Sequence, residues 1–62
     1  MLNEKKINDI QDECGFLSIS GRLYYIVDYQ GGRFVFQELH GDQRRYLTYE
    51  ELRTDDSFDI AY

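Results

Sequence analysis

The chain has 62 residues, a net charge of −5, one cysteine and one histidine. A chain of this length buries only about 60% of the surface that it exposes when unfolded, so we expect one small domain over residues 1–62. One cysteine and one histidine can build neither a disulfide nor a structural metal site within the chain, and we expect no metal and no cofactor. The apolar core must therefore suffice, and six Tyr and four Phe are available to fill it.

The negative charge disfavours direct binding to nucleic acid or to an anionic membrane, because both need cations that neutralise phosphate. It is also uneven along the chain. Residues 1–15 carry −2, residues 16–47 carry +1 and residues 48–62 carry −4. No apolar run follows the two lysines near the start, so we expect neither a signal peptide nor a membrane span, and a cytoplasmic location.

The first segment predicts an amphipathic helix over residues 4–13. Asn3 is a suitable N-cap, and Ile7, Ile10 and Cys14 recur at helical spacing. Gly15 is typical of a position just past a helix end. A lone cysteine in such an apolar stripe is expected to behave as a small buried hydrophobe.

From Phe16 the apolar period changes to two and predicts strands over 16–20, 22–30 and 33–39. Gly31 and Gly32 are typical of a two-residue hairpin turn. That turn would pair Tyr29 with Phe34 and Tyr25 with Glu38. It would place Tyr24 on the outer face, and it would place on the inner face Leu23, Tyr25, Val27, Tyr29, Phe34 and Phe36.

A second turn at Gly41-Asp42 predicts a fourth strand over 43–47, with Glu38 opposite Arg45 and Phe36 opposite Leu47. Thr48 and Glu51 then have the spacing of a capping box, and Leu47 and Leu52 have the spacing of a hydrophobic staple around it. The last stretch alternates apolar and polar residues and predicts a closing strand; its sequence is DSFDIAY.

These elements predict an α+β fold that is mainly β, with an N-terminal helix ahead of four or five antiparallel strands. Their order, with one helical turn before the last strand, resembles that of small SH3-like barrels. An open antiparallel sheet packed on the N-terminal helix would use the same pattern.

Catalysis is not expected, because His40 beside a turn has no nucleophile placed near it and so short a chain offers little room for a closed pocket. Aromatic residues could instead form a cage or a stacking platform. Core packing accounts for most of them, and Tyr24 is the one left on the less apolar face.

Carboxylates gather in the segment from Thr48 to Asp59. Glu51 has a predicted capping role, and Glu50 also favours the start of a helix because it complements the helix dipole. Asp55, Asp56 and Asp59 have no capping or pairing role in the predicted fold, and their spacing does not match a calcium-binding loop. They are either a solvated surface or a binding surface.

The chain resembles small acidic accessory proteins of bacteriophages, including anti-CRISPR and other anti-defence inhibitors. The resemblance rests on a chain of 62 residues that starts at Met1, on acidic ends that read NDIQDE and EELRTDDSFD, and on a Tyr-rich strand that reads LYYIVDY. It implies stoichiometric binding to a host protein in place of nucleic acid.

We therefore expect a non-enzymatic inhibitor whose acidic surface blocks the basic site of a nucleic-acid-handling protein. The expected partner-binding residues are Tyr49, Glu50, Asp55, Asp56 and Asp59, with Tyr49 as an aromatic anchor. The alternative is a small cellular adaptor that binds a peptide or a subunit through its sheet edge or its Tyr24 face.

Overall fold

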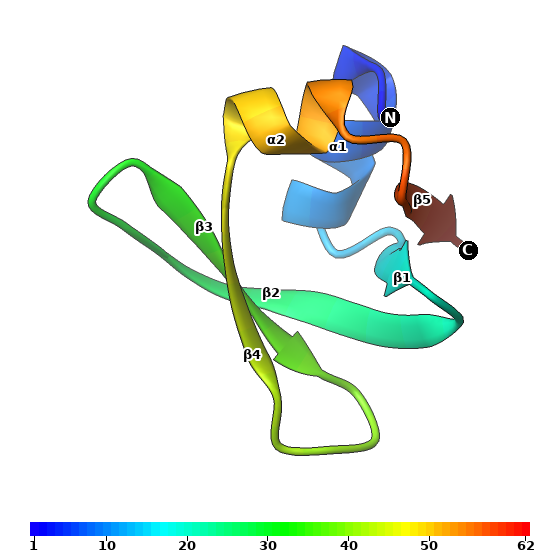
Figure 1. The fold of residues 1–62 in the computed structure, drawn as a ribbon, viewed down its shortest axis with the longest axis vertical. Coiled ribbons are helices and arrows are strands. Elements are labelled where there is room, and N and C mark those ends of the chain that lie inside the picture. The colour runs from blue at the N-terminus through cyan, green and yellow to red at the C-terminus, as the bar shows by residue number, and fades with distance from the viewer.

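A computed structural model describes all 62 residues of the chain. The elements in chain order are α1 (Glu4–Gln11), β1 (Phe16–Ile19), β2 (Arg22–Gln30), β3 (Arg33–Glu38), β4 (Arg44–Thr48), α2 (Tyr49–Thr54) and β5 (Phe58–Ala61). The strands form one antiparallel sheet in the order β4-β3-β2-β1-β5, which leaves β4 and β5 as its edges. The sheet curls into a half-barrel below the two helices (Figure 1). The predicted α+β, mainly β fold is thus confirmed.

Helix α1 begins as predicted. The Asn3 side chain accepts a hydrogen bond from the Lys6 N–H at 2.9 Å, and this satisfies one of the free donors of the first turn. Ile7 and Ile10 are buried against the sheet. The apolar stripe of this helix therefore consists of these two residues, which pack into one side of the core.

The end of α1 differs from the prediction. The helix ends at Gln11, and the N–H groups of Glu13 and Cys14 donate to the carbonyls of Ile10 and Asp9 at 3.1 and 2.8 Å. This is a Schellman motif, and Glu13 occupies its left-handed position with φ of 61°. The chain turns away at this point, so Cys14 is exposed and the prediction that it is buried is wrong.

Glycine is required at position 15 because a side chain there would clash with a neighbour, and not because the helix ends there. A Cβ at this position would lie 2.9 Å from Cδ1 of Ile60. The left-handed position of the helix end is instead taken by Glu13, where a residue with a side chain costs about 1 kcal/mol relative to glycine.

The β2–β3 hairpin has the predicted turn but not the predicted register along its whole length. Gly31 and Gly32 both have positive φ, and Tyr29 pairs with Phe34. A β-bulge at Val27 then shifts the pairing by one residue, so that Ile26 lies opposite Phe36 and Tyr24 opposite Glu38.

The bulge exchanges the two faces of the first half of β2. Tyr24 is 3% exposed and belongs to the core, whereas Tyr25 is 36% exposed on the outer face. The predicted inner positions of Leu23, Tyr25 and Val27 are therefore wrong, and so is the expectation of a Tyr24 binding face. A single extra residue reverses every side chain that precedes it because strand side chains alternate.

The β3–β4 connection is longer than predicted. The Glu38 N–H donates to the Gln43 carbonyl at 2.8 Å and closes a four-residue loop, so that Leu47 lies opposite Phe34 and Arg45 opposite Phe36. Glu38 forms a salt bridge with Arg22 at 3.6 Å, and its predicted pairing with Arg45 is wrong. The register differs from the prediction by two residues, which preserves the face, so Leu47 is buried as expected.

Helix α2 is short and locally capped. The Thr48 hydroxyl accepts from the Glu51 N–H at 3.1 Å, and the Glu51 carboxylate accepts from the Thr48 N–H at 3.0 Å. Leu47 and Leu52 are both buried beside this box. The predicted capping box is confirmed, and both residues of the predicted staple lie in the core.

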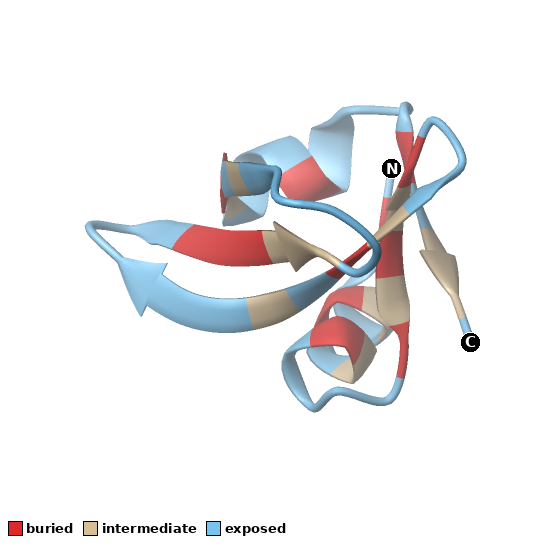
Figure 2. Ribbon diagram, turned by 90° about the horizontal axis from the view of Figure 1, so that it is seen from below, coloured by how far each residue is buried: buried red, intermediate tan, exposed pale blue.

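The core lies between the inner face of the sheet and the two helices. β3 has a continuous buried stretch from Phe34 to Phe36, whereas the tip of the β2–β3 hairpin is exposed (Figure 2). The core cluster consists of Leu2, Ile7, Ile10, Leu17, Ile19, Tyr24, Phe34, Phe36, Leu47, Leu52 and Phe58. Neither helix is long and apolar enough to cross a membrane.

The bulge can be tested with two adjacent substitutions. We expect Tyr24→Ala to lower the free energy of unfolding by about 3 to 5 kcal/mol, because it removes a buried aromatic ring. Tyr25→Ala is the matched control and should cost under about 1 kcal/mol, because its side chain is on the outer face. Chemical denaturation of both variants measures the difference, and a larger loss for Tyr25→Ala would restore the unbulged register.

Candidate functional site

The N-terminal residues join the two acidic ends of the chain. The Leu2 N–H donates to the Leu52 carbonyl at 2.9 Å, and the Met1 nitrogen donates to the carbonyls of Asp55 and, at 2.9 Å, Phe58. Residues 1–15 and 48–62 therefore lie side by side (Figure 1). Their net charges of −2 and −4 combine to −6, and we call these two segments together the acidic end.

The acidic end has little internal neutralisation. Its one salt bridge joins Lys5 and Asp9 at 3.0 Å, and the Tyr62 hydroxyl donates to the same carboxylate at 2.7 Å. The hydrogen bond from Tyr62, followed by that from Lys5, lowers the pKa of Asp9. The other carboxylates of this end form no salt bridge.

The five predicted partner-binding residues are all exposed. Tyr49 and Glu50 begin α2, Asp55 follows its last residue, Asp56 lies in the next turn and Asp59 lies in β5. The four carboxylates thus follow one continuous segment of the acidic end. Tyr49 belongs in addition to a separate feature, an aromatic hollow described below.

Asp55 has a local role that the sequence analysis missed. Its Oδ1 accepts from the N–H and the hydroxyl of Ser57 at 2.9 and 2.6 Å. The hydroxyl first, and then the N–H, lowers the pKa of Asp55. The expectation that Asp55 lacks a capping or pairing role is therefore wrong. An Asp with Ser two residues later is a recognisable turn pattern that could have revealed it.

Asp59 is held more simply, since its Oδ1 accepts from the N–H of Ile60 at 2.8 Å. β5 pairs with β1 from Phe58 to Ala61, and Asp59 lies opposite Ser18 in that ladder. The backbone of Asp59 is therefore fixed by the sheet. The side chain of Asp56, which lies between Asp55 and Asp59 in the sequence, makes no hydrogen bond or salt bridge within the chain.

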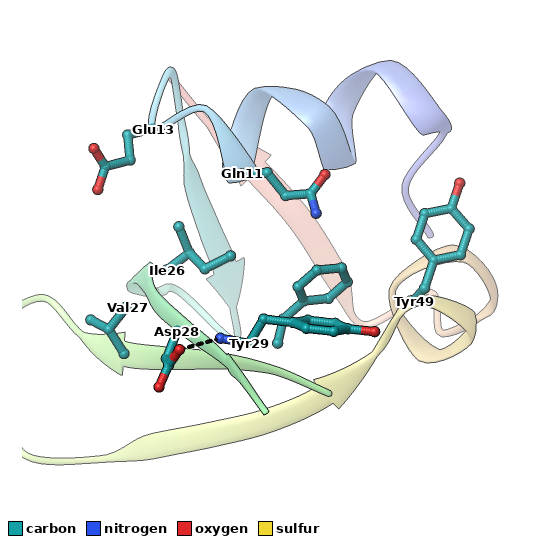
Figure 3. A pocket seen from close by; sticks show the side chains of 8 residues that line it. Gln11, Glu13, Ile26, Val27, Asp28, Tyr29 and Tyr49 are labelled. Carbon is teal, nitrogen blue, oxygen red and sulfur yellow. Dashed lines mark hydrogen bonds between the residues drawn. The ribbon is translucent and has the colours of Figure 1, made fainter. Parts of the chain in front are cut away.

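A hollow of about 670 Å³ lies between the end of α1, the β2–β3 hairpin and the start of α2. It is bordered by Gln11 at the end of α1, Glu13 in the turn that follows, residues 26–29 of β2, Phe34 of β3 and Tyr49 of α2 (Figure 3). The rings of Tyr29 and Phe34 are 4.9 Å apart between centroids and tilted by 53°. We call this feature the aromatic hollow.

Both tyrosines of the aromatic hollow are exposed to solvent. Tyr29 is 58% exposed and Tyr49 is 40% exposed. A second hollow of about 240 Å³ adjoins the first, and Glu13 and Ile26 border both. Glu13 therefore lies at the junction of the two hollows.

No sequence motif marks the aromatic hollow, although the lengths of the elements indicate where it lies. An eight-residue helix spans about 12 Å, whereas a nine-residue strand spans about 30 Å. β2 must therefore extend beyond the helix that covers it. Apolar residues near its far end, such as Tyr29, are left uncovered.

The titratable side chains that border the aromatic hollow are Glu13, Asp28, Tyr29 and Tyr49, and it is bordered by no serine, cysteine, histidine or lysine. No group of three or more His, Cys, Asp or Glu side chains is arranged to hold a metal ion. Comparisons of the chain with protein-family models, with curated proteins and with solved structures find no match.

The fold should lose stability in acid. Hydrogen bonds lower the pKa of Asp9, Asp28 and Asp55 below the ordinary 3.8 and that of Glu51 below 4.5, the last chiefly through the Thr48 N–H. A carboxyl whose pKa falls on folding stabilises the folded state above its unfolded pKa, and this stabilisation is lost as the pH falls through the folded pKa. We expect the melting temperature to fall from about pH 4.5 downward.

Thermal melts between pH 7 and pH 2 measure this loss, with Glu51→Gln as the control variant. This variant should start from a lower melting temperature at pH 7 and show a shallower decline, because it lacks one of the titrating hydrogen-bond acceptors. A wild-type melting temperature that rises on acidification would mean that repulsion among the carboxylates outweighs their hydrogen bonds.

Proposed function

We propose that the chain is a non-enzymatic binding protein whose acidic end docks on the basic, nucleic-acid-binding site of another protein and blocks that site. One observation above all supports this proposal. Contacts of Met1 and Leu2 with the segment from Leu52 to Phe58 bring both acidic segments together, so that charge separated along the sequence becomes one surface. The carboxylates of this surface present negative charge to a basic groove, as the phosphates of a nucleic acid would.

The anchoring of the carboxylates favours tight docking. Asp55 is held by Ser57, and Asp59 stands on a strand that is paired along its length. Fixed anions lose less side-chain entropy on binding than mobile ones do. Long-range attraction from a net charge of −6 also speeds the encounter with a cationic partner.

Such a protein acts stoichiometrically, in the manner of the inhibitors that phages direct against host defence systems. Its place of action is then the cytoplasm, where nucleic-acid-handling proteins work. Tyr49, at the start of α2 beside Glu50, supplies the aromatic contact that central interface positions favour.

An adaptor is the second candidate function, and the open sheet favours it. The outer sides of β4 and β5 have no strand partner, so either edge can accept an extended segment of another protein. In this case the acidic end would serve solubility only.

The decisive experiment compares the wild type with the triple variant Asp55→Asn, Asp56→Asn, Asp59→Asn. Tagged protein first isolates a partner from an extract of the source cells, and nucleic acid is then tested as a competitor of the complex. We expect the triple variant to associate with that partner roughly tenfold or more slowly at low salt, and the difference to shrink as salt rises.

Two single variants control for net charge. Asp56→Asn and Asp42→Asn each remove one exposed carboxylate, but Asp42 lies in the loop before β4 and outside the acidic end. Only Asp56→Asn should slow association. Equal association rates for the wild type and the triple variant at every salt concentration would reject the inhibitor proposal in favour of the adaptor.

A further inference from the structure

The aromatic hollow has a composition that suits one kind of side chain. We infer that it binds an arginine side chain of a partner protein, with the guanidinium against the tyrosine rings and with carboxylates at the rim as counter-charges. Ile26, Tyr29, Phe34 and Tyr49 supply the apolar and aromatic surface, and Glu13 and Asp28 supply the charge.

The two tyrosine rings of the hollow offer stacking surface that the core does not use. Tyr29 continues the inner face of β2 beyond the reach of α1, and its ring rests on Phe34 with 58% of the residue exposed. In the close-up Gln11 lies above its ring and Tyr49 to one side (Figure 3). A planar guanidinium stacks on such faces and is less strongly hydrated than an ammonium, so arginine fits better than lysine.

The charges around the hollow select a cation. Glu13 and Asp28 lie at its rim, and no arginine or lysine borders it. Asp28 is held by the Tyr29 N–H and the Gln30 amide at 2.8 and 2.6 Å, whereas Glu13 forms no salt bridge within the chain. An anionic occupant would be repelled, and so would a second copy of a chain that carries −5.

The chain itself already places a guanidinium on one of these rings. The Cζ of Arg53 lies 5.8 Å from the centroid of the Tyr49 ring. Arg53 does not border the hollow, whereas Tyr49 does, and 40% of Tyr49 is exposed.

Glu13 adds an independent observation. It takes the left-handed position of the Schellman motif with φ of 61°, where glycine would be free of strain. Strained backbone positions cluster at binding sites, and Glu13 borders both hollows. The side chain is exposed and free to turn toward a bound cation.

The test is a titration of isotope-labelled protein with a blocked glycine-arginine-glycine tripeptide, followed by backbone amide NMR. We expect saturable shifts of the amides of Glu13, Ile26, Tyr29 and Tyr49. The dissociation constant should be on the order of 1 mM, because one side chain in an open hollow gains little. The same tripeptide with citrulline, which has the same shape and no charge, should cause no saturable shifts.

Variants assign the two kinds of contact. Tyr29→Leu keeps apolar volume but removes the ring, and it should weaken binding roughly 2- to 30-fold. Tyr46→Leu is its matched control, because Tyr46 is also exposed but alternates with the inward-facing Leu47 along β4, and it should leave the dissociation constant unchanged. Glu13→Gln should weaken binding roughly two- to fivefold, whereas Asp42→Asn should not.

Glu13→Gly gives a second measurement with an opposite sign. It relieves the left-handed strain, so we expect a higher melting temperature together with weaker binding of the arginine tripeptide. Absence of saturable shifts in the hollow at about twenty times the expected dissociation constant, or equal binding of the citrulline tripeptide, would overturn the inference. The probe does not involve Asp55, Asp56 or Asp59, so either result leaves the proposed docking of the acidic end to its own test.

Discussion

The extra residue in β2 determines how the rest of the molecule is arranged. Tyr24 and Tyr29 are separated by five positions, an odd number, and in a regular strand they would face opposite sides of the sheet. The bulge at Val27 lets both face inward. Tyr24 can therefore complete the core under α1 while Tyr29 lines the aromatic hollow farther along the same face. Without the bulge, one of the two would be lost to the outer surface.

Features that depend on neighbouring residues could be predicted from the sequence. The Gly31-Gly32 turn, the Asn3 cap and the capping box of Thr48 with Glu51 each follow from chemistry within a few positions. The β3–β4 register was misplaced by two residues, yet Leu47 still faced the core, since an even shift preserves the face.

Features that depend on the whole fold could not be predicted in this way. The bulge leaves no trace in the run from Leu23 to Val27, because all five residues are apolar or aromatic and suit either face. Glu13 occupies a position where glycine is the usual sequence marker, so the sequence predicts a helix that runs to residue 13, two residues past its actual end at Gln11. The acidic end forms only because Met1 contacts residues more than fifty positions away, and no local sequence pattern predicts that contact.

The open half-barrel also bears on how the protein avoids forming fibrils. An unpaired edge is a template for the strand of another chain, and stacked strands would bring identical side chains to within about 4.8 Å of each other. β4 carries the adjacent cations Arg44 and Arg45, and the short β5 carries Asp59. Like charges therefore oppose stacking at both edges near neutral pH. β5 carries one charge where β4 carries two adjacent ones, so the β5 edge is the one through which cross-β growth can start more easily.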